Sequence, residues 1–188
     1  MFAYQADFSR RRLLSVGAGL AAAAAIAPKA AFAAPLQAAE RRIALFNTHT
    51  GESVKTVYWA EGSYVPDGLR EVNRVLRDFR TGDVFPMDPK LFDLLNRVQS
   101  LTEANGKTFQ IISGYRSPKT NTMLHNASAK SGVATHSMHM DGKAMDIRLP
   151  GVELNNLRKA ALSLQAGGVG YYPESNFVHM DTGRVRFW

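Results

Sequence analysis

The sequence contains no cysteine, which excludes disulfide cross-links and thiolate metal sites. A metal ion could therefore be held only by histidine, aspartate or glutamate side chains. Histidine is also scarce, because the chain has five such residues among 188. These are His49, His125, His136, His139 and His179. Any imidazole chemistry must come from this small set.

Long hydrophobic runs are lacking as well. The apolar stretch from Leu13 to Ala27 consists mostly of alanine and glycine, and it is shorter than the ~20 residues that a membrane-spanning helix needs. It follows the basic cluster Arg10–Arg12 and precedes Ala31–Ala33, an A-x-A cleavage site. We therefore predict that residues 1–33 form a signal peptide, and that the mature protein has no membrane span.

The arginine cluster bears on the export route. Ser9-Arg10-Arg11-Arg12-Leu13-Leu14 resembles the twin-arginine signal, whose pathway carries folded proteins. An arginine-rich general secretion signal and an uncleaved amino-terminal anchor are the alternatives. All three place the protein in the cell envelope, and the first two predict the periplasm.

The charge balance gives a weaker indication of the target. Removal of residues 1–33 takes away four basic groups and one acidic group, so the net charge falls from +7 to +4. A modest positive charge suits an anionic target such as cell-wall polymer. No basic stripe is interleaved with aromatic residues, which argues against a nucleic-acid partner. Nothing suggests an obligate protein partner, so we expect a monomer.

The rest of the chain has the composition of one globular domain, with 45% hydrophobic and 21% charged residues. We expect a linker over 34–42 and a domain over 43–188. The hydrophobic periodicity predicts four helices: an amphipathic helix from Leu69 to Phe79, a helix from Asp88 that buries residues as far as Leu101 and ends by Gly106, a helix from Ser117, and a helix over 154–164 closed by Gly167 and Gly168. It also predicts a β-hairpin over 41–64 and strands over 109–112, 143–149 and 176–182. This order predicts an α+β fold with a small antiparallel sheet.

Two segments carry candidate metal ligands. His139 lies just before a glycine turn, and Asp146 lies in the predicted strand that follows. His179 and Asp181 share one face of a second predicted strand. If the two strands pair, two imidazoles and one carboxylate can converge, which is typical of a catalytic zinc site with an open fourth position. Spacing alone leaves open that these are ordinary structural residues.

A family resemblance strengthens the metal interpretation. Ser137-x-His139-x-x-Gly142-x-Ala144-x-Asp146 resembles the S-x-H-x-x-G-x-A-x-D signature of the D-Ala-D-Ala-type zinc peptidases. That group shares a fold with the lysostaphin-type peptidases and the hedgehog signalling domain. Within it the chain is most similar to the MepK family of periplasmic murein endopeptidases. The similarity extends through residues 49–52, 76–80, 113–118 and 177–188, and so covers nearly all of the mature chain.

The resemblance implies an activity and a set of site residues. It implies that His139, Asp146 and His179 bind one zinc ion, and that the enzyme hydrolyses amide bonds in peptidoglycan peptide cross-links. Arg116 would bind or polarise the substrate carbonyl, a task that suits a permanently charged guanidinium. A structural ion pair is the alternative role for Arg116.

The general base departs from the family pattern. Many D-Ala-D-Ala peptidases have glutamate three residues before the last histidine ligand, or histidine two residues before it. Here these positions are Asn176 and Phe177. Asp181 is the first candidate base, because it lies on the same strand face as His179, although it could equally well orient the ligand histidine instead. His136 and Glu174 are the other candidates, and His136 has the more suitable pKa range.

Two other functions stay open from the sequence. One is a carboxypeptidase that trims D-Ala from stem peptides. The other is a wall-binding module that retains zinc without hydrolysis, and the absence of glutamate at position 176 favours it. We expect His49 and His125 to be structural or exposed. The sequence does not specify which peptidoglycan bond is cut.

Overall fold

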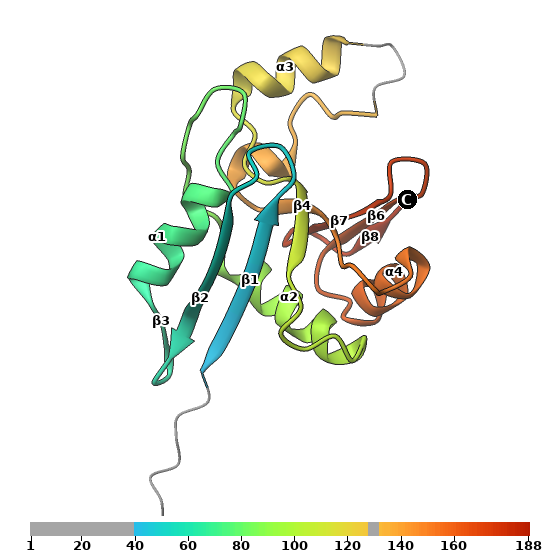
Figure 1. The fold of residues 1–188 in the computed structure, drawn as a ribbon. Helices are drawn as coiled ribbons and strands as arrows, with labels where there is room; N and C mark the ends of the chain where they lie inside the picture. The colour runs from blue at the N-terminus through green and yellow to red at the C-terminus, as the bar shows by residue number, and fades with distance from the viewer. Residues whose placement is uncertain (1–39, 128–131) are drawn as a thin grey trace, which may run out of the picture. The chain divides into compact units, whose positions relative to one another are not determined.

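The computed structural model describes residues 40–127 and 132–188 (Figure 1). The predicted signal peptide and most of the predicted linker lie outside these residues. The first strand begins at Arg41, inside the range expected for the linker. Within the described part of the chain, no helix has the length and apolar character needed to cross a membrane.

One mixed sheet of eight strands organises the fold. The strands are β1 Arg41–Asn47, β2 Ser53–Ala60, β3 Ser63–Tyr64, β4 Phe109–Ser113, β5 Ala144–Arg148, β6 Gly168–Tyr172, β7 Phe177–Asp181 and β8 Arg186–Phe187. Their spatial order is β3-β2-β1-β4-β5-β7-β6-β8. The α+β class is as expected, and β1 and β2 form the predicted hairpin.

The sheet differs from the small antiparallel sheet that we predicted. It is larger, and β1–β4 and β6–β8 pair in parallel. The chain between β1 and β4 includes two helices, and such a long crossover is what parallel neighbours require. Strand β6 was not predicted at all, because its glycines were interpreted as the end of a helix.

The helices begin largely where the sequence predicts. They are α1 Pro66–Val75, α2 Pro89–Leu101, α3 Pro118–Asn126, the short 3₁₀ helix η1 Met138–Asp141, and α4 Leu154–Ser163. Proline in the first turn suits a helix start because the first amides have no intrahelical partner. The Asp88 side chain caps α2 by accepting a hydrogen bond from Lys90 N, and Ser117 caps α3 by accepting one from Thr120 N.

Two helix-face assignments were wrong. Helix α1 ends at Val75, so Phe79 lies outside it and stacks on His49 with ring centroids 3.8 Å apart. Leu101 is the last residue of α2 and is 55% exposed, not buried. In both places the apolar spacing continues past the end of the helix or past its last buried residue.

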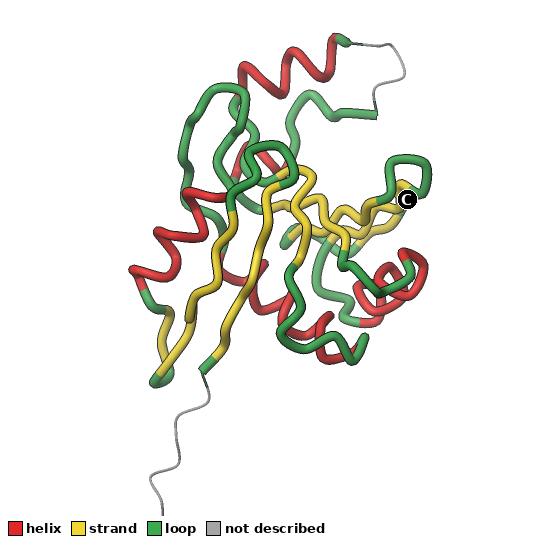
Figure 2. Tube along the Cα trace, in the orientation of Figure 1, coloured by secondary structure: helices red, strands yellow, loops and turns green. Residues whose placement is uncertain are grey.

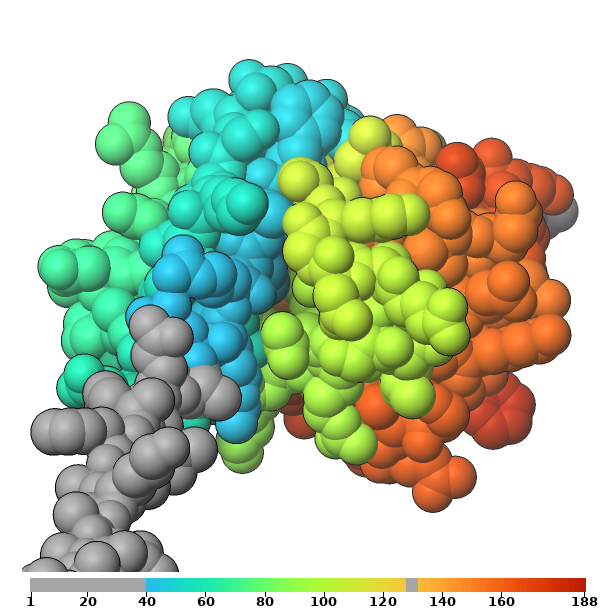
Figure 3. Space-filling view, turned by 60° about the horizontal axis from the view of Figure 1, so that its bottom comes forward, coloured from blue at the N-terminus to red at the C-terminus, as the bar shows by residue number. Residues whose placement is uncertain are grey.

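The helices that pack on the sheet leave one end of the domain to loops and helix α3. Helices α1 and α2 pack on β1, and α4 packs on β6 and β7. Figure 3 shows the amino-terminal strands, the segment around β4 and the α4 region side by side on one face. The loop between α1 and α2, helix α3 and the segment that precedes η1 gather at the same end (Figure 2). The central strands β5 and β7 are buried along almost their whole length.

Candidate metal centre

His139 is held in a fixed orientation by the short helix η1. Its backbone amide donates to Ser137 Oγ at 3.4 Å, and the helix ends at Gly142, whose φ is 65°. The ring nitrogen Nδ1 lies 2.7 Å from the carbonyl oxygen of Gly114, so Nδ1 carries the hydrogen. The lone pair of Nε2 therefore faces the centre of the site.

Asp146 and His179 face each other across paired strands. Strands β5 and β7 are antiparallel, and Asp146 lies directly opposite His179 in the register. Asp146 Oδ1 lies 2.8 Å from His179 Nδ1 and 3.3 Å from His139 Nε2. The two facing imidazole nitrogens are 3.3 Å apart. The strand pairing on which the predicted convergence depended is thus present.

The three side chains fit a metal ion. One ligand atom from each of His139, Asp146 and His179 lies within 4.8 Å of the others, and all three residues are buried. Tetrahedral ligands about 2.1 Å from zinc would be roughly 3.4 Å apart, close to the separations found here. Two nitrogens and one carboxylate oxygen are a donor set that zinc accepts.

The electrostatics of the site also favour a cation. Burial lowers the pKa of His139, so its ring is neutral as a ligand should be. Burial would raise the pKa of Asp146, but the two imidazoles outweigh this and hold it well below its usual range. Burial would lower the pKa of His179, but hydrogen bonds with Asp146 and Asp181 raise it to about 9. At neutral pH the His179 ring thus carries a proton beside Asp146, and a metal ion would take the place of that proton on Nδ1.

Asp181 lies behind His179, away from the centre. Its Oδ2 accepts from His179 Nε2 at 3.1 Å and from the guanidinium of Arg186 at 2.6 Å. Its Oδ1 accepts from the backbone amides of Gly168 at 3.0 Å and Gly183 at 2.8 Å. The side chain is fully buried. This carboxylate contacts the ring nitrogen that does not face Asp146, and it fixes the tautomer of His179.

Arg116 lies on the other side of Asp146. Its Nη2 is 3.6 Å from Asp146 Oδ2 and 3.4 Å from Ser113 Oγ, and its Nη1 is 3.5 Å from Asn121 Oδ1. Burial lowers the pKa of this guanidinium, which nevertheless stays charged. All of these contacts are long, so the donors of Arg116 are weakly engaged.

A cavity of about 290 Å³ opens onto the ligand atoms. Arg116 and His136 line it together with the three candidate ligands. The His136 side chain is 72% exposed, and its Nε2 lies 3.3 Å from Asp141 Oδ2. Glu174 is exposed in the turn between β6 and β7 and does not line the cavity. Of the three candidate bases, His136 is the one in the cavity.

The sequence reasoning missed one wall of this cavity. Tyr172, Phe177 and Trp188 line it and bring aromatic rings beside the candidate ligands. Tyr172 and Phe177 flank the β6–β7 hairpin, so an assignment of β6 as a strand would have revealed them. Position 176, where the D-Ala-D-Ala-type pattern would place glutamate, holds Asn176 with a φ of 53° in that turn. Asparagine tolerates this left-handed conformation better than most residues.

Two of the five histidines, His49 and His125, are exposed. His49 Nε2 lies 3.1 Å from the carbonyl oxygen of Ile112, and His125 Nδ1 lies 2.6 Å from that of Val133. Neither residue belongs to the group of candidate ligands. Both therefore have the structural or exposed positions that we expected.

Comparison with known proteins decides the family. The family model described as "Peptidoglycan L,D-endopeptidase MepK" matches residues 36–188. The chain belongs to this MepK family. Peptidoglycan L,D-endopeptidase MepK of Escherichia coli (strain K12) is 48% identical over 182 residues, which cover 97% of this chain and 98% of that protein. MepK of Shigella flexneri has the same identity and coverage.

A more distant MepK relative covers the chain equally well. The probable peptidoglycan L,D-endopeptidase MepK of Haemophilus influenzae (strain Rd) is 38% identical, over 97% of this chain and 96% of its own length. No solved structure gave a significant match. The family match spans every described element from β1 to β8, including both strands that carry the candidate ligands.

Proposed function

We propose that this MepK-family endopeptidase hydrolyses an L,D amide bond in peptidoglycan cross-links, with one zinc ion held by His139, Asp146 and His179. The observation that carries the proposal is the convergence of these three buried side chains at a cavity, in a chain that matches the family over its whole domain. The L,D specificity rests on the names of the relatives.

The zinc ion and Arg116 have complementary roles in this proposal. When bound, zinc lowers the pKa of a coordinated water and polarises a carbonyl oxygen. The weakly engaged guanidinium of Arg116 is placed to donate to the oxyanion that develops as the amide is attacked. A permanent charge with fixed donors suits this task.

We assign the proton transfers to His136 and an orienting role to Asp181. His136 lines the cavity and is exposed, so it can take a proton from water and return it to the leaving amine. Asp181 accepts five hydrogen bonds, two of them from Arg186, and has no exposed side-chain surface. Such a carboxylate positions the ligand His179, as commonly seen for histidine ligands of zinc.

The predicted signal peptide completes the proposal. A wall hydrolase must be exported, and residues 1–33 have the charge and apolar pattern of an export signal. We propose a periplasmic location, reached by the twin-arginine route. Replacement of Arg10 and Arg11 by lysine, with fractionation of the cells, tests that route against general secretion.

The activity is tested on isolated sacculi. The purified domain with zinc should convert cross-linked muropeptides to uncross-linked products of the size expected for L,D cleavage. His139→Ala should release none of them. A digest unchanged by the zinc-loaded protein would refute the hydrolytic function and favour a wall-binding module. Release of free alanine alone would identify a carboxypeptidase.

A further inference from the structure

The indole of Trp188 lies beside the candidate metal centre. Its ring centroid is 5.2 Å from that of His179, with 47° between the planes. The residue lines the cavity together with the three candidate ligands, and it is 46% exposed. A large aromatic surface is therefore presented next to the reacting centre.

Several contacts hold this ring still. Its Nε1–H donates to the Tyr172 hydroxyl at 2.8 Å, and the Arg186 guanidinium lies 5.0 Å from the ring centroid. The Trp188 backbone is also fixed, because its amide donates to Val169 O at 3.2 Å and its carbonyl accepts from Tyr171 N at 3.1 Å. The side chain is exposed without being free to move.

The sheet leaves room for the ring at one position. A Cβ added at Gly170 would lie 2.7 to 2.9 Å from three atoms of the indole. Glycine in the middle of a strand costs stability, and a close approach by another group is one common reason for it. Strand β6 is thus shaped to accept Trp188 against its backbone.

The neighbouring rings extend the same wall. Tyr172 and Phe177 stack with centroids 4.5 Å apart, and both line the cavity. Binding cavities commonly combine apolar and aromatic walls with a few polar groups that set the orientation. Here Arg116 and the ligands supply the polar groups, and the rings supply the wall.

We propose that Trp188 is a substrate-binding residue, whose indole packs against an aliphatic segment of the peptidoglycan peptide next to the scissile amide. This inference rests on the proposed function for the identity of the substrate. A rigid aromatic face offers a large contact area at low entropic cost. The contact exists before and during the reaction, so it contributes to substrate affinity more than to the chemical step.

Steady-state kinetics on a soluble cross-linked muropeptide test the inference with three variants. Trp188→Ala removes the ring, and Gly170→Ala keeps it but displaces it. Both should raise KM about tenfold, with kcat changed less than threefold and zinc content equal to that of the parent. Phe187→Ala is the matched control, because Phe187 is 71% exposed and does not line this cavity. It should leave both constants unchanged.

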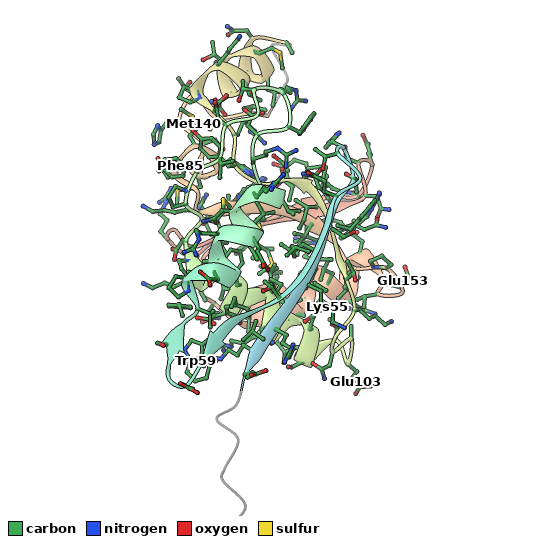
Figure 4. The ribbon with its side chains drawn as sticks, turned by 60° about the vertical axis from the view of Figure 1, so that its left-hand side comes forward. Lys55, Trp59, Phe85, Glu103, Met140 and Glu153 are labelled. Atoms are coloured by element: carbon green, nitrogen blue, oxygen red, sulfur yellow. The ribbon has the colours of Figure 1, made fainter. Side chains whose placement is uncertain are left out.

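Tryptophan emission gives a readout that does not need hydrolysis. The chain has two tryptophans, Trp59 and Trp188. Trp59 lies at the opposite end of the domain from Met140, which neighbours His139 (Figure 4). In a Trp59→Phe protein, the muropeptide should shift or quench the remaining emission saturably. Adding His136→Gln, which should lower kcat and retain zinc, slows turnover during the titration.

The outcomes separate the two proposals. KM values in Trp188→Ala and Gly170→Ala that equal the Phe187→Ala value would overturn the substrate-binding role. So would an emission that does not respond at muropeptide concentrations above KM. A parent protein that hydrolyses no muropeptide would instead refute the proposed function, and the emission titration would still decide whether Trp188 contacts the peptide.

Discussion

The two ring nitrogens of His179 face different partners, and this division explains the residues around it. Nδ1 faces Asp146 and the centre of the site, whereas Nε2 faces Asp181. The carboxylate of Asp181 is itself held by Arg186. A chain of hydrogen bonds thus runs from Arg186 through Asp181 to the His179 ring and fixes its direction.

The first prediction contrasts Asp181 with His136. Asp181→Asn should weaken zinc affinity about 10–100-fold, because it loosens a ligand histidine. His136→Gln should retain zinc and lower kcat about 10²–10⁴-fold, because it removes a proton carrier. Zinc content by atomic spectroscopy and kcat at saturating zinc measure the two effects.

Matched variants control this contrast. Asp93→Asn alters another aspartate that pairs with an arginine, Arg41, far from the ligands in sequence. His49→Gln alters a histidine that does not line the cavity. Both should retain zinc and activity. Full kcat in His136→Gln combined with a loss of kcat at saturating zinc in Asp181→Asn would show that Asp181 is the base after all.

The second prediction concerns the glycine of the signature. Gly142 has a φ of 65°, and a Cβ there would lie 2.4 Å from the carbonyl oxygen of Pro86. Gly51 has a φ of 72°, and a Cβ there would have no atom within 4 Å. Gly51→Ala should therefore cost about 1 kcal/mol for the backbone conformation alone.

Gly142→Ala should lower the free energy of unfolding more than Gly51→Ala does, because the neighbouring chain at Pro86 also has to shift. We expect a loss of about 2–4 kcal/mol in the free energy of unfolding. Urea denaturation of the two variants measures the difference. Equal losses would mean that the close approach to Pro86 is unimportant, and that the signature glycine serves the turn only.

At the scale of elements, a buried carboxylate joins two loops near the site. Asp78 follows α1, and its Oδ2 accepts from the Ser117 backbone amide at 2.9 Å and from Ser117 Oγ at 2.6 Å. Its Oδ1 accepts from Arg80 N at 2.9 Å. Ser117 caps α3 and adjoins Arg116, so this contact sets where the guanidinium enters the cavity.

The third prediction follows from the charge of Asp78. Burial would raise its pKa, but the hydrogen bonds from Ser117, Thr120 and Arg80 lower it to about 2. The unfolded value is about 4. Because the folded pKa is the lower one, the stabilisation is complete above pH ~4 and is lost as the pH falls toward ~2.

Asp78→Asn should remove that stabilisation. We expect a loss of about 2–3 kcal/mol at pH 7, because buried donors lose a charged acceptor. The difference from the parent should shrink between pH 4 and pH 2. Asp67→Asn is the control, since the Asp67 side chain is 78% exposed and should change stability by less than about 0.5 kcal/mol. A difference that is constant with pH would contradict the assignment.

The elements also show what sequence patterns can predict here. The starts of α2 and α3 were predictable because Asp88-Pro89 and Ser117-Pro118 act locally, through a cap and a fixed φ. Strand β6 was not predictable, because its glycines are required by groups that are distant in the sequence and approach its backbone closely. A Cβ at Gly168 would lie 2.4 Å from Asp181 Oδ2, and one at Gly170 would meet Trp188. Such tertiary constraints produce no periodic pattern in the local sequence from which a strand could be predicted.

The residues of the candidate site likewise divide into those that local sequence patterns could predict and those that depend on tertiary contacts. The convergence of the three candidate ligands was predictable because the alternation of β5 and β7 places Asp146 and His179 on definite faces, and the signature supplies His139. The aromatic wall depends on β6 and β8, which the sequence analysis did not resolve as strands. The same holds for Arg186, which reaches Asp181 from β8.

At the scale of the whole molecule, the proposed ion would tie together segments far apart in the chain. Its ligands come from η1, β5 and β7, and β5 and β7 are central strands of the sheet. The two imidazoles and the carboxylate that would hold it are buried together. An ion that binds only the folded state would stabilise the entire domain.

The fourth prediction gives that stabilisation a magnitude. With free zinc at 100 times its Kd, the free energy of unfolding should rise by about 2.7 kcal/mol. For a domain of this size the melting temperature should then increase by about 5–10 °C, and chelation should reverse the increase. Asp146→Asn should show little response to zinc, whereas Asp93→Asn should respond as the parent does. If Asp146→Asn is stabilised by zinc to the same extent as the parent, the ion binds elsewhere on the chain.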